Sequence, residues 1–317
     1  MKVSEKKLTM IEDTFDFSEE EIQQMLDNLD SFSVDEVVEI DRIVDELAVR
    51  NQNELAYNDL LEFCKRLQPD YIVGKHHKIL ANLLMAIERG DKDRICVNIP
   101  PRHGKSQLVS IYFPAWFLGR NPNKKVMMVS HTTDLAVDFG RKVRNLISTE
   151  EYKQIFPTVS LASDSKSAGR WNTNIGGEYY ACGIGSSIAG RGADLLLVDD
   201  PHSEQDVING NFGVFEKAYE WFTFGARTRL MPGGRVAIIQ TRWHMDDLTG
   251  RVTRDMGTNA RSDQYEVVEF PAILDTNDKE GKPTQKALWP EFFDLDALLR
   301  TKASMPTFQW NAQYQQE

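Results

Sequence analysis

One stretch, residues 94–106, restricts the possible folds of this chain more than any other. It reads as a short apolar strand, a tight turn, and Gly104-Lys105-Ser106 at the start of an amphipathic helix. This layout is typical of a loop in which backbone N–H groups and a helix N-terminus face a phosphate. Lys105 would reach the β- and γ-phosphates, and the Ser106 hydroxyl would ligate Mg²⁺. Ile99 occupies the first glycine position of the usual GxxxxGK[ST] pattern, so the loop departs from it.

Strand-like and helix-like segments alternate after this loop. Residues 125–131 form an apolar run, and Thr132 is the predicted cap of an amphipathic helix that follows. Further apolar runs occur at 195–198, 235–239 and 264–273. Alternation of this kind predicts an α/β fold with a mostly parallel sheet covered by helices on both faces.

Two of these predicted strands end in polar residues. Asp199 and Asp200 follow the first, and Gln240 and Thr241 follow the second. Ligands bind at the carboxyl edge of open α/β sheets, so these groups are candidates for the same site as the loop. Asp199 would hold the Mg²⁺ shell and Asp200 would orient or activate the attacking water. Gln240 and Thr241 would sense the γ-phosphate.

Two other segments keep alternative interpretations. Tyr71, His76 and His77 precede the loop and could hold adenine, or they could be a helix cap and surface histidines. The glycine-rich residues 183–192 contain Arg191, which could touch DNA or lie near a nucleotide. They could also be a simple connector before a buried strand.

Charge divides the chain unevenly. The first 60 residues hold 17 of the 48 Asp and Glu but only 5 of the 37 Lys and Arg, so the remainder is nearly neutral. The acidic segment is predicted to be helical, with one short amphipathic helix over residues 22–29 and helical spacing continuing over 34–47. It is either a docking arm for a partner or a helix pair packed on the core. No apolar run is long enough for a membrane span, and three scattered cysteines suit a reducing compartment.

Several spaced motifs together resemble one protein family, the large subunit of the terminase of tailed double-stranded DNA bacteriophages and prophages. The segments that carry the resemblance are residues 100–106 (PPRHGKS), 190–194 (GRGAD), 195–202 (LLLVDDPH), 240–244 (QTRWH) and 310–316 (WNAQYQQ). The resemblance runs from about residue 60 to the end and does not cover the acidic first 50 residues.

The resemblance implies a P-loop ATPase of the additional-strand, RecA-like type. In that fold the strand ending at Gln240 lies between the strand before the loop and the strand ending at Asp199. It implies ATP and Mg²⁺ as ligands, and hydrolysis that drives DNA into a procapsid in the host cell cytoplasm. The implied partners are double-stranded DNA, the portal protein, the small terminase subunit and further copies of this chain in a ring.

The resemblance also assigns roles to residues. Lys105 and Asp200 would be catalytic, Arg102 would contact phosphate within the subunit, and Arg191 or Arg170 would be an arginine finger acting on a neighbouring subunit. The family usually has Glu where this chain has Asp200, which is one methylene shorter. The expected nucleotide contacts are Arg102, His103, Gly104, Lys105, Ser106, Gln107, Tyr71, His77, Gln240 and Thr241, with Ser106 and Asp199 as Mg²⁺ ligands.

We therefore expect an acidic helical segment over residues 1–55, an ATPase core over 56–275 and a helical linker over 276–317. Full-length family members carry a nuclease domain after such a linker, and we expect no nuclease activity from this chain. Two other functions stay open. The acid pair superficially resembles the box of a helicase-type translocase, although about 75 residues after Arg242 are too few for a second RecA-like domain. The second open function is that of a non-catalytic protein with a decayed phosphate loop.

Overall fold

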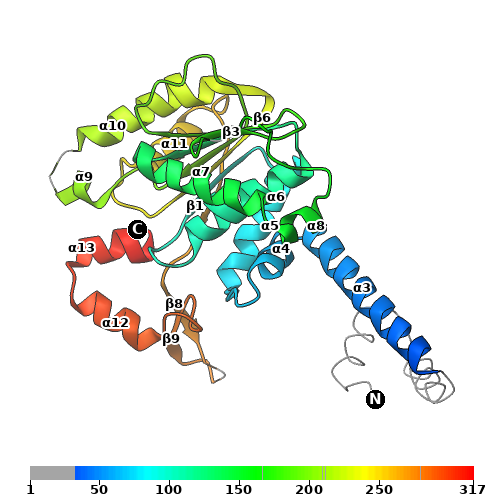
Figure 1. Cartoon of the computed structure of the whole chain (residues 1–317). Coiled ribbons are helices and arrows are strands. Elements are labelled where there is room, and N and C mark those ends of the chain that lie inside the picture. Colours follow the sequence, from blue (N-terminus) through cyan, green and yellow to red (C-terminus); the bar gives the residue numbers. More distant parts are fainter. Residues whose placement is uncertain (1–32, 166, 209, 211, 279) are drawn as a thin grey trace.

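The structure is a computed structural model that describes residues 33–317 except 166, 209, 211 and 279. The helix predicted over residues 22–29 lies outside the described residues. A sheet forms the centre of the molecule (Figure 1). It has seven strands, in the order β3-β4-β2-β5-β6-β1-β7. Its strands are β1 (Arg94–Asn98), β2 (Lys125–Ser130), β3 (Arg170–Asn172), β4 (Glu178–Gly183), β5 (Ala193–Asp199), β6 (Leu230–Gln240) and β7 (Glu266–Glu269).

The sheet is parallel except at one edge. All neighbouring pairs from β4 to β7 run parallel, and only the edge strand β3 pairs antiparallel with its neighbour β4. β6 lies between β1 and β5, which confirms the additional-strand order of a RecA-like P-loop fold. Parallel strands end at the same edge, so the segments after β1, β5 and β6 meet there.

Both faces of the sheet are buried. Alternate residues of each strand point to opposite sides, and each side contributes to a separate core. On β1, Ile95 and Val97 join one core while Cys96 joins the other. On β5, Leu196 belongs with Cys96. Helices that contribute to the first core include α4 (Leu60–Leu67), α5 (Lys75–Arg89), α6 (Phe113–Arg120), α7 (Thr133–Ile147) and α8 (Glu150–Ile155). The second core receives side chains from η3 (Trp221–Ala226) and α11 (Leu248–Thr258), with α10 (Gly213–Glu220) beside them (Figure 1).

The acidic N-terminal segment forms one long helix, α3 (Val34–Asn58). Its C-terminal part packs on α4 and α8 and buries Ala48 and Ala56. The remainder projects away from the body, and Val38 and Ile43 are exposed on it (Figure 1). The helical spacing predicted over residues 34–47 is therefore confirmed.

The helix after the phosphate loop changes form along its length. It passes through a π-helical turn, η2 (Gln107–Tyr112), before α6, and the Phe113 N–H bonds to the Leu108 carbonyl. Pro114 follows at once, and proline has no N–H to continue a regular ladder. The helix accommodates this proline with a wider helical turn ahead of it.

The strand before Thr241 is longer than the apolar run over residues 235–239 predicts. β6 already begins at Leu230, directly after the short helix η4 (Arg227–Arg229), and so includes residues 231–234. The register of β6 against β5 shifts between Ala193 and Leu195, which absorbs the irregular Pro-Gly-Gly part of the strand.

The last 45 residues form a small layer of their own. They contain the hairpin β8 (Ile273–Asn277) and β9 (Pro283–Ala287), and the helices α12 (Leu295–Ala303), α13 (Thr307–Trp310) and η5 (Asn311–Gln315). A third core cluster around Leu298 and Trp310 holds these elements together. The Ala272 N–H donates to the Tyr314 carbonyl, so the chain end returns to the base of the hairpin (Figure 1). Across the described ranges we find no helix with the length and apolarity needed to cross a membrane.

Candidate active site

The predicted chemical groups meet at the carboxyl edge of the sheet. Lys105 follows β1, Asp199 ends β5 with Asp200 next, and Gln240 ends β6 with Thr241 next. Since β6 lies between β1 and β5, these three strand ends are neighbours, although residues 105 and 240 are far apart in the sequence. This edge is where open α/β sheets bind their ligands.

The loop itself begins as an extension of the sheet. The Ile99 N–H donates to the Gln240 carbonyl at 3.0 Å, and the Thr241 hydroxyl donates to the Ile99 carbonyl at 3.1 Å. Ile99 is fully buried in the first core. The position that usually holds glycine is thus occupied by a residue that pairs and packs as part of the strand. The turn comes later, with positive φ at Arg102 (62°) and Gly104 (77°) before the helix begins at Lys105.

Lys105 is paired with Asp200. Its Nζ lies 2.7 Å from Asp200 Oδ2, and only 8% of the lysine side chain is exposed. Burial by itself lowers the pKa of Lys105, but the charges of Asp200 and Asp199 outweigh burial and raise its pKa above the ordinary value. The lysine is therefore a permanent cation at neutral pH, already directed at the place where strand β5 ends.

Asp199 lies deeper, at the last position of β5. Its Oδ2 accepts a hydrogen bond from Ser110 at 2.6 Å, while its Oδ1 is buried without a partner among the described residues. Burial and the neighbouring Asp200 charge raise the pKa of Asp199, against the opposing effects of Lys105, Ser110 and Ser106. A buried carboxylate oxygen without a partner beside the Ser106 hydroxyl is a donor set that fits Mg²⁺, which prefers oxygen ligands.

Asp200 is held from three sides. Its Oδ1 accepts the Thr241 N–H at 2.9 Å, and its carbonyl accepts the His131 N–H at 3.1 Å. Its backbone φ is +45°, a left-handed conformation that a short polar residue tolerates. An open pocket of about 440 Å³ borders Asp200, lined also by His131, His202 and Trp243. Asp200 therefore borders open space at this edge of the sheet, with room for a water molecule.

Gln240 is the least satisfied of these residues. Its side chain is buried, and neither its Oε1 nor its Nε2 has a hydrogen-bond partner among the described residues. An unpartnered buried amide is costly. A bound ligand or water would satisfy it.

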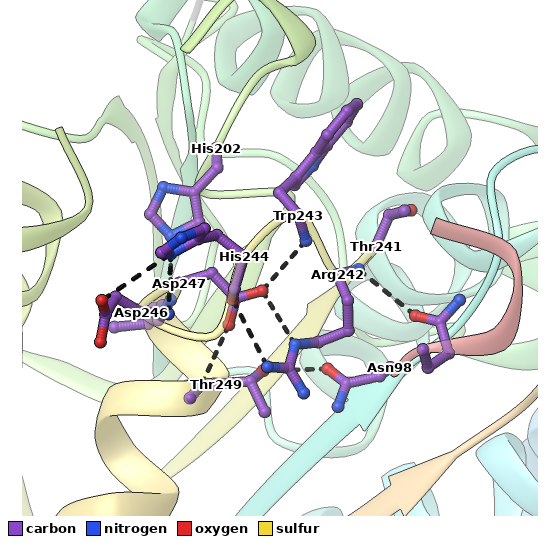
Figure 2. Close-up of polar contacts among 12 residues, drawn as sticks. Asn98, His202, Thr241, Arg242, Trp243, His244, Asp246, Asp247 and Thr249 are labelled. Atoms are coloured by element: carbon purple, nitrogen blue, oxygen red, sulfur yellow. Dashed lines mark hydrogen bonds and ion pairs between the residues drawn. The ribbon is translucent and has the colours of Figure 1, made fainter. Parts of the chain in front are cut away.

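The segment after Thr241 is organised by Asp247, as Figure 2 shows. Asp247 is fully buried and accepts from Arg242 Nε at 2.8 Å, from the Trp243 N–H at 3.1 Å and from the Gly250 N–H at 3.0 Å. The last bond caps the N-terminus of α11. One carboxylate thus fixes both the start of a helix and the backbone next to Thr241.

The same network reaches two other parts of the chain. Thr249 donates to Asn98 Oδ1 at 2.9 Å, at the end of β1 (Figure 2). The Arg242 N–H donates to Gln316 Oε1 at 3.3 Å, and Gln316 is buried. The strand end that contacts Asp200 is therefore connected through hydrogen bonds to both β1 and the C-terminal segment.

The residues upstream of the loop lie beneath it. His76 and His77 are both buried, so their interpretation as surface histidines is wrong. His77 does take part in the helix cap, because its Nδ1 accepts the Gly74 N–H at 3.0 Å. Tyr71 packs against His77 at a ring-centroid distance of 5.8 Å and is nearly buried. Contact of Tyr71 and His77 with adenine stays a prediction.

Other loop residues take distinct positions. The His103 ring is buried, its Nδ1–H donates to the Pro101 carbonyl at 2.8 Å, and it stacks on Phe293. Burial lowers the pKa of His103 to about 4. Gln107 donates to Gln68 Oε1 at 2.7 Å, and Arg102 is exposed. Arg102 is thus the loop side chain with most freedom to meet a ligand.

The two candidate arginine fingers lie at the other edge of the sheet. Arg191 and Arg170 both bind Glu178 Oε1, at 3.2 Å and 3.3 Å. Glu178 begins β4, and β4 runs parallel to the strands that end at the candidate site. Neither arginine therefore joins Lys105 and Asp200 within the same subunit.

Two residues of this site, Ser110 and Asp247, are not among those predicted from the sequence. Ser110 follows Ser106 by four positions, a helical spacing that places both hydroxyls on one face and signals a shared partner. Asp247 precedes an amphipathic run, which predicts a helix N-cap. That Asp247 also holds Arg242 and Trp243 depends on the fold of the loop and has no local signal.

Comparison with known proteins gives one family match. The model described as "Terminase large subunit, T4likevirus-type, N-terminal" matches residues 96–310. No curated protein matches the chain. Among solved structures, the HK97 bacteriophage large terminase is similar at 14% identity and a TM-score of 0.46, covering 78% of this chain and 51% of that one. The Thermus phage P74-26 large terminase ATPase domain is similar at 16% identity and a TM-score of 0.44, covering 78% of this chain and 99% of that one.

The chain thus spans about half the length of the HK97 protein. The family model matches residues 96–310, which are more than half of this chain. This range includes every strand end of the candidate site. The chain belongs to the family of T4likevirus-type terminase large subunits, in the part described as N-terminal.

Proposed function

We propose that this chain is the motor domain of a terminase, an ATPase whose hydrolysis of ATP drives double-stranded viral DNA into a procapsid. The observation that supports this most directly is the meeting of Lys105, Asp199 and Asp200 with the strand end at Thr241. Phosphoryl transfer needs this combination, because its catalysis consists mainly of positioning and of neutralising charge on the phosphate oxygens.

In the proposed reaction, the incoming phosphates compete with Asp200 for Lys105. The lysine moves from the carboxylate to the β- and γ-phosphate oxygens, and Asp200 then accepts a hydrogen bond from the attacking water. Exposed Arg102 adds a second cation on the phosphate side. Thr241 keeps the Asp200 carboxylate oriented through its N–H. The 2.7 Å pair between Lys105 and Asp200 is therefore the resting state of the site.

Ser106 and Asp199 would hold Mg²⁺, consistent with the unpartnered Asp199 Oδ1. When bound, the ion neutralises charge on the β- and γ-phosphate oxygens. Ser110 would keep the other Asp199 oxygen occupied, so that the carboxylate presents one oxygen to the site. Gln240, whose amide has no partner among the described residues, would contact the nucleotide or its water.

The wider assembly is part of the same proposal. The ring of subunits would form on the portal protein, with the small terminase subunit delivering DNA, in the host cell cytoplasm. Arg191 or Arg170 would leave Glu178 and act on a neighbouring subunit. The division into residues 1–55, 56–275 and 276–317 also stays a proposal. DNA contact would be to phosphates and independent of base sequence.

Substitution of the loop lysine tests the proposed hydrolysis. Lys105→Ala should lower ATP turnover by at least about 10²–10³-fold, the usual loss when a group that stabilises transition-state charge is removed. Lys124→Ala is the matched control, because Lys124 pairs with Asp194 at the opposite edge of the sheet, 3.0 Å away. Phosphate release would be measured for both. Undiminished turnover in Lys105→Ala would rule out this site as the ATPase centre.

A second measurement tests the motor role. Double-stranded DNA should stimulate turnover of the wild-type chain, and the stimulation should fall as salt rises, because DNA phosphates release counterions on binding. Stimulation that depended on base sequence and not on salt would contradict the proposed translocation.

A further inference from the structure

Two buried imidazoles converge on one carbonyl of the phosphate loop. His76 Nε2 lies 3.0 Å and His77 Nε2 lies 3.1 Å from the carbonyl oxygen of His103. Both histidines lie in the first turn of α5, directly beneath the loop, and both are at most 1% exposed. A carbonyl oxygen has two lone pairs, so two N–H donors satisfy it fully.

The surrounding contacts determine which ring nitrogens carry protons. His77 Nδ1 accepts the Gly74 N–H at 3.0 Å, so its proton must be on Nε2. His76 Nδ1 is buried without a partner among the described residues, which leaves Nε2 as the donor to the carbonyl. Burial, with the neighbouring His76, lowers the pKa of His77 to about 3, and burial also lowers the pKa of His76. Both rings are therefore neutral at pH 7, with one donor each.

The orientation of that carbonyl sets the orientation of the next N–H. A trans peptide is planar, and its N–H points opposite to its C=O. No described peptide bond is cis. The carbonyl of His103 points toward His76 and His77. The N–H of Gly104, in the same peptide group, therefore points away from these two histidines. This N–H precedes the helix that begins at Lys105, where backbone donors bind anions.

The fit beneath the loop is tight. A Cβ on Gly104 would lie 2.3 Å from His77 Nε2, so the imidazole occupies the space that a side chain would need. Gly104 also has a φ of +77°, and Arg102 has a φ of +62°. Glycine adopts a positive φ without cost, whereas the same conformation at Arg102 costs energy that surrounding contacts must offset. The two hydrogen bonds to the carbonyl between them provide such contacts.

We propose that His76 and His77 are positioning residues of the phosphate loop, which hold the His103 carbonyl inward so that the Gly104 N–H is available to a nucleotide phosphate. The inference rests on the proposed ATPase function. This role explains how the loop can lack the first glycine of the usual pattern. The side chains of His76 and His77 orient its backbone. It also gives His77 a role through the loop in place of direct contact with adenine, since both of its ring nitrogens are occupied.

His76 offers the cleaner test, because its Nδ1 has no partner to lose. His76→Gln keeps an N–H donor near the position of Nε2, whereas His76→Leu removes it and keeps an apolar side chain. His76→Leu should bind Mg-ATP about 10-fold more weakly, as expected for loss of one orienting hydrogen bond. His76→Gln should return affinity to within about 3-fold of wild type on the same scale. Equal affinities of the two variants, measured by calorimetry, would overturn the inference.

Trp289→Phe separates positioning from packing. Trp289 packs against both rings, at centroid distances of 5.4 Å to His76 and 4.7 Å to His77, and does not bond the carbonyl. If the histidines act only as packing, Trp289→Phe should weaken Mg-ATP binding as much as His76→Leu does. We expect a lower melting temperature with unchanged affinity.

A nucleotide-free measurement keeps this inference distinct from the proposed function. Long-range ¹H–¹⁵N NMR spectra of the imidazoles should show the Nε2–H tautomer for both His76 and His77. In His76→Leu the Nε2–H signal of His77 should exchange faster with water, because the carbonyl is released. An Nδ1–H tautomer, or an unchanged His77 signal, would overturn the positioning role. Failure of the wild-type chain to bind Mg-ATP would instead overturn the proposed function.

Discussion

Asp247→Asn isolates the contribution of the network beside Thr241. The carboxylate has two functions on its two oxygens: Oδ1 caps α11 through Gly250, and Oδ2 receives Arg242 and Trp243. Asparagine caps helices as well as aspartate does. With its carbonyl oxygen at the cap, however, the asparagine NH₂ group faces two other donors. The substitution therefore preserves the helix start and breaks only the contact with the loop.

The size of the effect follows from the burial of the pair. Removing one partner of a buried ion pair costs about 3–5 kcal/mol. Arg242 is 14% exposed and retains Glu269 at 3.5 Å, which places the loss nearer about 2–3 kcal/mol. For a chain of this size, that loss corresponds to a melting temperature lower by about 5–10 °C.

Thermal unfolding measures this loss, with Asp294→Asn as the matched control. Asp294 caps α12 by accepting the Ala297 N–H at 2.7 Å and has no arginine partner in the part of the chain that the structure describes. It should stay within about 0.5 kcal/mol of wild type. Because Thr241 orients Asp200, Asp247→Asn should also lower the turnover rate more than the affinity for Mg-ATP. A melting temperature within about 1 °C of wild type would refute the assigned energy of the buried pair.

The remaining predictions concern pH and the loop glycine. His77 and His103 have pKa values lowered to about 3 and about 4. Below pH 6.5, these two imidazoles therefore become protonated in the unfolded chain while they stay neutral in the folded chain. Stability is therefore full above that pH, and these two rings should together lower the free energy of unfolding in urea by about 4 kcal/mol at pH 5; a profile without this loss would contradict neutral buried rings. Gly104→Ala should weaken Mg-ATP binding at least 10-fold, about 1.4 kcal/mol, since its Cβ would meet His77. Gly176→Ala, also at positive φ but with nothing within 4 Å, should cost stability of about 1 kcal/mol and leave binding intact, and equal binding by both variants would refute the steric argument.

Local patterns predicted much of the fold correctly. The apolar runs before Gly104, before Asp199 and before Gln240 are strands, and Thr132 caps a helix as expected. These features depend on side-chain period and on capping preferences, which act over a few residues. The strand predicted over residues 235–239 is longer in the structure, beginning at Leu230, for the complementary reason. A strand can continue through Pro and Gly when a neighbouring strand absorbs the shift in register.

Sequence patterns specify which chemical groups the chain has and where strands end: Lys105 after β1, the acid pair after β5, and Gln240-Thr241 after β6. The partners of these groups depend on how the chain packs. The pairing of Lys105 with Asp200, the two histidines under the His103 carbonyl, and the contacts of Asp247 with Arg242 join groups that approach each other through strand order, loop conformation and burial. Hydrogen bonds act over about 3 Å, whereas a sequence pattern specifies only direction along one element. Which donor meets which acceptor is therefore a property of the packed molecule.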